Sequence, residues 1–134
     1  MSTNGSLYRS WTIRREPDAS GVSRQLISEA LEPLAAPATV ADVALLTSEL
    51  VTNVMMHTTD ICMVSLTFDP AERSVLVGVT DASPARGAAI EPERVAGDVG
   101  GFGLRLVDSI AVRWGCEVGV DSKTVWFELD THEP

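Results

Sequence analysis

The spacing of apolar residues along the chain alternates between a helical period and a strand period. Three stretches repeat apolar side chains every three or four residues, which predicts helices beginning near Val22, Thr39 and Leu104. The middle stretch has the strongest pattern. Its apolar positions are Val40, Val43, Ala44, Leu46, Leu50, Val51, Val54 and Met55. Pro33 and Pro37 mark the end of the first helix.

The remaining patterned stretches are rich in β-branched and aromatic residues or alternate apolar with polar positions, which predicts strands. They span residues 7–14, 61–68, 74–80, 114–120 and 124–129. The turn sequence at residues 69–72 joins two of them as an antiparallel hairpin. The order β-α-α-β-β-loop-α-β-β predicts an α+β fold, with helices covering one face of a mostly antiparallel sheet.

Residues 7–130 are predicted to form one domain, preceded by a loose tail at residues 1–6. Residues 82–100 contain several prolines and glycines and few large apolar side chains. This segment predicts a long loop, and such loops in compact domains are usually functional or mobile.

Composition and charge narrow the class of protein. The 134 residues are 45% hydrophobic and 22% charged, which excludes a disordered chain. Ten Lys and Arg against nineteen Asp and Glu give a net charge of −9, which argues against direct nucleic-acid binding. The polar N-terminus does not resemble a secretion signal, and no apolar run approaches the roughly 18 residues of a membrane span. We therefore expect a cytoplasmic protein whose two cysteines are reduced.

Three short motifs carry candidate chemistry. Glu49 and Asn53 are four residues apart and share one face of the predicted middle helix, where a carboxylate and an amide oxygen can hold Mg²⁺. Asp81 ends a predicted strand, and it is either a turn residue or an acceptor for the amino group of adenine. The glycines at 100, 101 and 103 precede the third helix, where free amides and the helix dipole suit a phosphate, although a flexible hinge has the same composition.

Together these motifs resemble the GHKL (Bergerat-fold) ATPases, in the branch of actinomycete anti-sigma-factor serine/threonine kinases. The segment Glu49-Leu50-Val51-Thr52-Asn53 resembles the N box, with His57 after it. Asp81-Ala82-Ser83-Pro84 resembles the first glycine box, and Gly100 to Trp114 with Gly115 resembles the second. The resemblance extends over about residues 7–130 and implies a two-layer α/β sandwich that binds ATP and Mg²⁺.

The resemblance also implies a role for each candidate residue. Asn53 would ligate Mg²⁺, Glu49 would act as general base, and Asp81 would recognise adenine. Phosphate-binding and site-closing positions would be Gly101, Phe102, Gly103, Leu104 and, from the last strand, Thr124. Residues 85–100 would form the ATP lid. The first glycine box departs from the pattern, since it has no glycine at position 82 or 83, and Met56 replaces a more usual basic residue.

Two functions follow from this resemblance. The first is an anti-sigma factor that is also a serine/threonine kinase, acting on an anti-anti-sigma protein of the STAS type. The second is a nucleotide-gated module that binds these partners without significant kinase activity. The resemblance implies a sigma factor and an anti-anti-sigma protein as partners, and a homodimer. A split sensor histidine kinase is disfavoured because no phosphoacceptor helix pair is visible.

Overall fold

The computed structural model describes residues 5–57, 61–81 and 102–131. The elements in chain order are β1 (Leu7–Arg14), α1 (Ala19–Leu31), α2 (Pro37–His57), β2 (Ile61–Asp69), β3 (Ser74–Asp81), α4 (Phe102–Ile110), β4 (Arg113–Val118) and β5 (Lys123–Asp130). The predicted α+β fold is confirmed. The predicted loop at residues 82–100 lies outside the described ranges.

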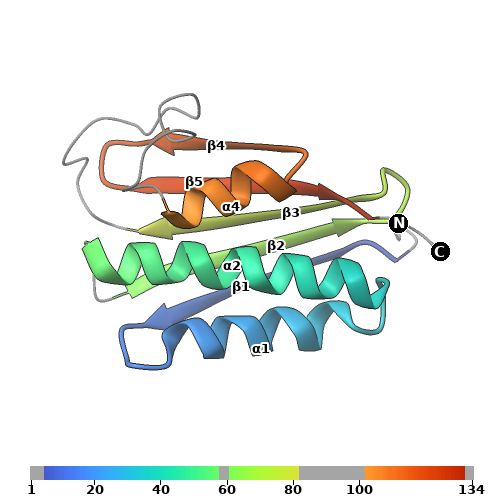
Figure 1. The fold of residues 1–134 in the computed structure, drawn as a ribbon, viewed down its shortest axis with the longest axis horizontal. Coiled ribbons are helices and arrows are strands. Elements are labelled where there is room, and N and C mark those ends of the chain that lie inside the picture. Colours follow the sequence, from blue (N-terminus) through green and yellow to red (C-terminus); the bar gives the residue numbers. More distant parts are fainter. Residues whose placement is uncertain (1–4, 58–60, 82–101, 132–134) are drawn as a thin grey trace.

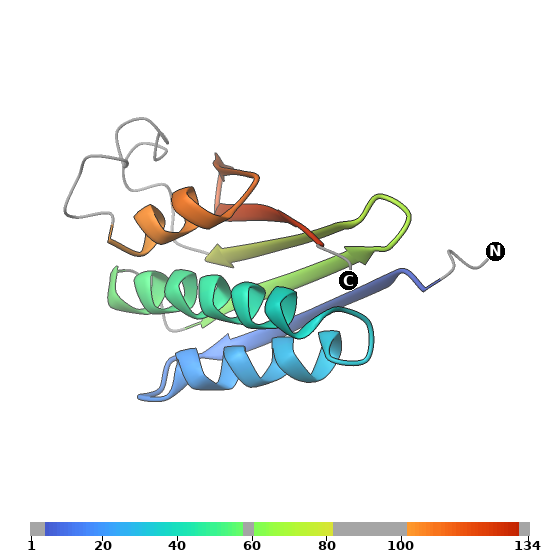
Figure 2. The ribbon, with the colours of Figure 1, turned by 45° about the vertical axis from the view of Figure 1, so that its right-hand side comes forward.

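The strands form one antiparallel sheet in the order β1-β2-β3-β5-β4. The last strand, β5, therefore lies between β3 and β4 and pairs with both. Helices α1, α2 and α4 lie side by side on one face of this sheet (Figures 1 and 2). We call this the covered face, and we call the opposite one, on which no described helix packs, the open face. The result is a two-layer sandwich with helices on one side.

All three helices begin two or three residues earlier than the apolar spacing indicates, α4 at Phe102 rather than Leu104. Helix α2 begins at Pro37, two residues before Thr39, because proline suits the first helical position, where its missing N–H is not needed. The carbonyl of Ala36 already accepts a hydrogen bond from the amide of Val40, at 3.0 Å. Helix α1 begins at Ala19, and the carbonyl of Asp18 accepts from the amide of Val22 at 2.9 Å. The first turns of α1 and α2 contain few large apolar side chains, so their helical period is not visible in the sequence.

The core lies between the helices and the covered face. Side chains from both layers are fully buried, among them Ile27, Leu31, Val43, Leu46, Leu50, Val51, Val64, Leu66, Val75, Val77, Val79 and Phe127. Helix α2 is central, because it contacts α1, α4 and strands β2, β3 and β5. Since α2 crosses the middle of the sandwich, it can present polar residues to both of its helical neighbours.

One segment of α2, Pro37–Met55, is long and apolar enough to cross a membrane by length and composition, which the sequence analysis did not anticipate. In the structure, 61% of this segment is buried within the protein. A core helix that packs on several sides is expected to be apolar around much of its circumference. The hydropathy of α2 is therefore explained by its central place in the core.

Candidate functional site

Helix α2 presents Glu49 and Asn53 one turn apart, next to its buried apolar residues such as Leu50 and Val54. Both residues are half-buried, and neither side chain has a hydrogen bond or ion pair with any part of the chain that the structure describes. The nearby hydroxyls behave differently. Ser48 donates to the carbonyl of Leu45 at 2.8 Å, and Thr52 donates to the carbonyl of Ser48 at 2.9 Å. These hydroxyls are engaged by the helix backbone, whereas Glu49 and Asn53 remain available to a ligand.

The donor atoms of this pair fit a magnesium ion that is shared with a ligand. Carboxylate and amide oxygens are hard donors, and Mg²⁺ typically takes one or two protein ligands and completes its shell with waters and substrate phosphates. Within residues 5–57, 61–81 and 102–131, no group of three or more His, Cys, Asp or Glu residues could form a full metal cage. Glu49 and Asn53 therefore suit a phosphate-bound cation better than a structural metal.

Asp81 is the last residue of β3, and its side chain is only 1% exposed. Its cross-strand partners are Cys62 on β2 and Lys123 on β5. Burial, together with the charge of Asp81, raises the pKa of the Cys62 thiol from 9.0 to about 11. Asp81 thus places a carboxylate inside the covered face at the end of the strand, unlike a solvent-exposed turn residue.

Helix α4 brings the predicted phosphate-binding motif beside α2. Leu104 is buried in the core, and Figure 1 shows α4 lying along α2. Phe102 and Gly103 belong to the first turn of α4, and Gly101 lies outside the described ranges. A cavity of about 250 Å³ between the two helices is lined by Glu49, Arg105, Leu106 and Ser109. The fold therefore brings Glu49 together with the helix that follows the glycine motif.

Thr124, which was predicted to close the site from the last strand, does not share a face of the sheet with Asp81. It pairs with Thr80 on β3, and the two hydroxyl oxygens are 2.7 Å apart. Its neighbour Val125 is buried on the covered face, and successive side chains of a strand point to opposite faces. Thr124 therefore lies on the open face. Lys123, directly opposite Asp81, occupies the covered face at this end of β5.

Two further residues near α2, Arg105 and Arg15, were not predicted from the sequence. Arg105 lines the cavity from α4. The helical pattern that starts at Leu104 places Arg105 in the first turns of the predicted helix, directly after the glycine motif, and this position could have indicated it. Arg15 follows β1 and donates hydrogen bonds to the carbonyl of Met55, near the end of α2. Met55 is buried, as expected for a core residue. The side chains of Met56 and His57, at the end of α2, lie outside the description.

Comparison with known proteins gives a structural match. No family model matches the sequence, and no curated protein does. The fold is similar to a crystal structure of the RsbU and RsbW domains of Rv1364c from Mycobacterium tuberculosis, with a TM-score of 0.71 and 18% sequence identity. The matched part is the RsbW domain. This chain shares the fold of that matched part. The match covers 96% of this chain and 33% of the other, so the chain spans about a third of that protein's solved length.

Proposed function

We propose that this protein binds Mg²⁺-ATP and is an anti-sigma factor with serine/threonine kinase activity toward an anti-anti-sigma protein of the STAS type. One observation carries the proposal. In a fold similar to that of the RsbW domain, α2 presents Glu49 beside the helix that follows the glycine motif, with Asn53 one turn further along. Neither side chain has a partner among the residues that the structure describes. The acidic chain, with a net charge of −9, suits regulation through protein partners better than direct contact with nucleic acid.

Each residue has a role in this proposal. Asn53 would hold Mg²⁺, which when bound neutralises charge between the phosphates of ATP. The backbone amides at the start of α4, from Gly101 to Leu104, would bind phosphate oxygens with the aid of the helix dipole. Asp81 would accept a hydrogen bond from the adenine amino group. Thr124 is not part of the proposed site, because it lies on the open face.

The chemistry proposed for Glu49 is general-base catalysis. Its carboxylate takes the proton from a serine hydroxyl of the partner while that oxygen forms a bond to the terminal phosphorus of ATP. The bond between this phosphorus and the oxygen of ADP breaks, and ADP leaves with the electron pair. Positioning of the two substrates contributes most of the rate in such transfers, so the rigid helices α2 and α4 are suitable supports.

The partners follow from the same proposal. A sigma factor would be held inactive by this protein and released when the anti-anti-sigma protein binds. The protein would act in the cytoplasm, where these partners are found, and as a homodimer.

The test is Glu49→Gln, which keeps the shape of the side chain but removes its basicity. We expect ATP affinity to be retained and phosphoryl transfer to the anti-anti-sigma partner to fall by about 10²-fold or more. Glu32→Gln, the same chemical change at the exposed residue that caps the C-terminus of α1, is the matched control and should leave transfer unchanged. Radiolabelled ATP and calorimetry measure the two quantities. Absent transfer by the unmodified protein, together with intact partner binding, would instead favour a nucleotide-gated binding module.

A further inference from the structure

The cavity between α2 and α4 contains two opposite charges that do not neutralise each other. Glu49 enters it from α2 and Arg105 from α4, and the two form no ion pair. Elsewhere in the described chain, Arg113 pairs with Glu128 and Arg15 binds a backbone carbonyl. Arg105 has no such partner among the residues that the structure describes. Its guanidinium is therefore free to bind an anion in this cavity.

The position of Arg105 is set by the packing of the helix that carries it. Leu104 and Val107 are buried and anchor α4 to the core, and Trp114 on β4 donates to the carboxylate of Asp108 at 2.8 Å. Arg105 and Ser109 are four residues apart, so they lie on one face of α4, and both line the cavity. The helix thus holds Arg105 toward Glu49 without using its guanidinium as an anchor.

The chemistry of the cavity suits a phosphoryl group. Its described lining, around a volume of about 250 Å³, includes one guanidinium, one carboxylate and one hydroxyl. A guanidinium offers planar donors that match phosphate oxygens, whereas the carboxylate of Glu49 cannot donate when ionised. An anion in the cavity would therefore bind at Arg105, with Glu49 left facing it as a base.

We propose that Arg105 binds the terminal phosphoryl group of ATP, and so makes the site prefer ATP over ADP. This inference rests on the proposed function, because it requires a nucleotide whose phosphates end beside Glu49. An arginine of the same chain would then stabilise the charge on the transferred group, a role that arginine fills in other phosphoryl transfers. ADP lacks this terminal phosphoryl group, so it would gain less than ATP from Arg105.

The test compares ATP and ADP affinities by calorimetry in Mg²⁺, for the unmodified protein, Arg105→Met and Arg105→Lys. We expect Arg105→Met to weaken ATP binding about tenfold relative to ADP, and ADP affinity to change less than about twofold. Arg105→Lys should recover part of the preference, because it restores the charge but not the planar donors. Arg24→Met, which removes an exposed arginine from α1, is the control for net charge and should leave the ratio of affinities unchanged.

The outcomes separate this inference from the function on which it rests. If the unmodified protein binds neither nucleotide, the proposed function fails. If it binds both, and Arg105→Met weakens ATP and ADP equally or affects neither, the assignment of Arg105 is overturned while nucleotide binding stands. Circular dichroism melts of each variant confirm folding, which is expected because Arg105 is exposed and bonds no other described residue.

Discussion

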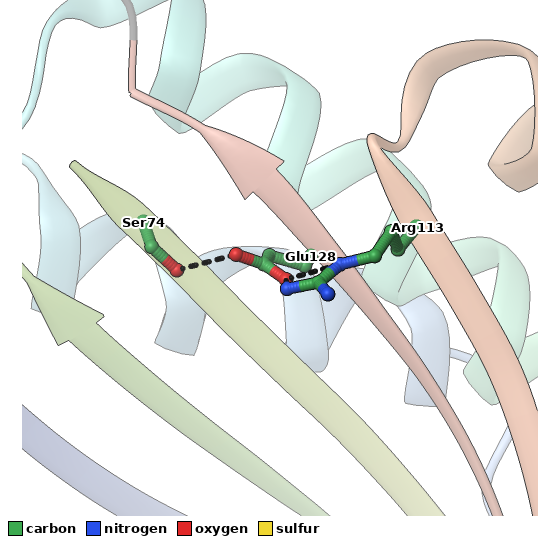
Figure 3. Close-up of polar contacts among 3 residues, drawn as sticks. All are labelled: Ser74, Arg113 and Glu128. Carbon is green, nitrogen blue, oxygen red and sulfur yellow. Dashed lines mark hydrogen bonds and ion pairs between the residues drawn. The ribbon is translucent and has the colours of Figure 1, made fainter. Parts of the chain in front are cut away.

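The two faces of the sheet are built from the same strands, yet one packs apolar side chains against the helices and the other carries polar side chains. On the covered face, β3 and β5 contribute buried apolar residues such as Val77 and Phe127, with Asp81 at one end. On the open face, the alternate residues of these strands are largely polar and bond to one another. Glu128 accepts from Ser74 at 3.1 Å and from the Nε of Arg113 at 3.0 Å (Figure 3).

The polar groups of the two faces also differ in their partners. On the open face, several side chains of β3, β4 and β5 pair across the strands, including the two hydroxyls of Thr80 and Thr124. Gly115 leaves room there for the indole of Trp126, since a β-carbon would lie only 3.0 Å from it. The covered face leaves Glu49 and Asn53 unpaired at its margin, among the described residues. The buried core and the candidate ligand-binding residues therefore lie on the same face of the sheet, the one that the helices cover.

The largest expected effect is a loss of stability when a core side chain at the centre of the covered face is truncated. Phe127 is 0% exposed, so Phe127→Ala should lower the free energy of unfolding by about 3–5 kcal/mol through lost burial and a residual cavity. Leu76, on the adjacent strand, is 40% exposed on the open face, and Leu76→Ala should cost less than about 1 kcal/mol. Urea denaturation measures both. Equal losses would show that the open face is also a packed surface in solution.

The next effect is a pH dependence of the free energy of unfolding, and it arises from Cys62 beside Asp81 on the covered face. Burial, and then Asp81, raise the pKa of Cys62 from 9.0 to about 11, so the folded state holds the proton more tightly than the unfolded state. This contribution is fully present below about pH 9 and is lost as pH rises toward 11. The loss is on the order of 2–3 kcal/mol.

The control for this prediction is Cys62→Ala, measured over the same pH range. The variant is less stable at neutral pH because it loses packing, but its stability should decline less steeply between pH 9 and 11. Parallel declines in the two proteins would show that Cys62 does not titrate differently on folding.

The smallest of these effects is on nucleotide affinity, which we expect to change with a substitution on α2 but not with one on the open face. Asn53→Ala should weaken Mg²⁺-ATP binding by about tenfold, or ~1.4 kcal/mol, because it removes the proposed metal ligand. Thr124→Val, on the open face, should change this affinity by less than about twofold. Calorimetry with and without Mg²⁺ isolates the metal-dependent part. A loss with Thr124→Val and none with Asn53→Ala would return Thr124 to the site and remove Asn53 from it.

Much of the fold was predictable from short-range patterns. The strand at residues 7–14 and the hairpin after Ile61 agree with the structure to within a residue, because alternation over eight or so positions is a local signal. The helix beginning near Thr39 was also predicted, and so was the pairing of Glu49 and Asn53 on one of its faces. The face occupied by Thr124 was not predictable, since moving the register of a strand by one residue exchanges its two faces.

By itself, the sequence determined the helices and strands, the apolar side of each, and the spacing of the N-box-like pair on α2. These features depend on residues within a few positions of one another, where backbone geometry dictates which side chains share a face. Only the tertiary structure decided that β5 lies between β3 and β4, that Lys123 rather than Thr124 lies opposite Asp81, and that Arg105 faces Glu49. These relations join segments distant in the chain. They are set by how the whole sheet and its helices bury their apolar surfaces together, which no local pattern specifies.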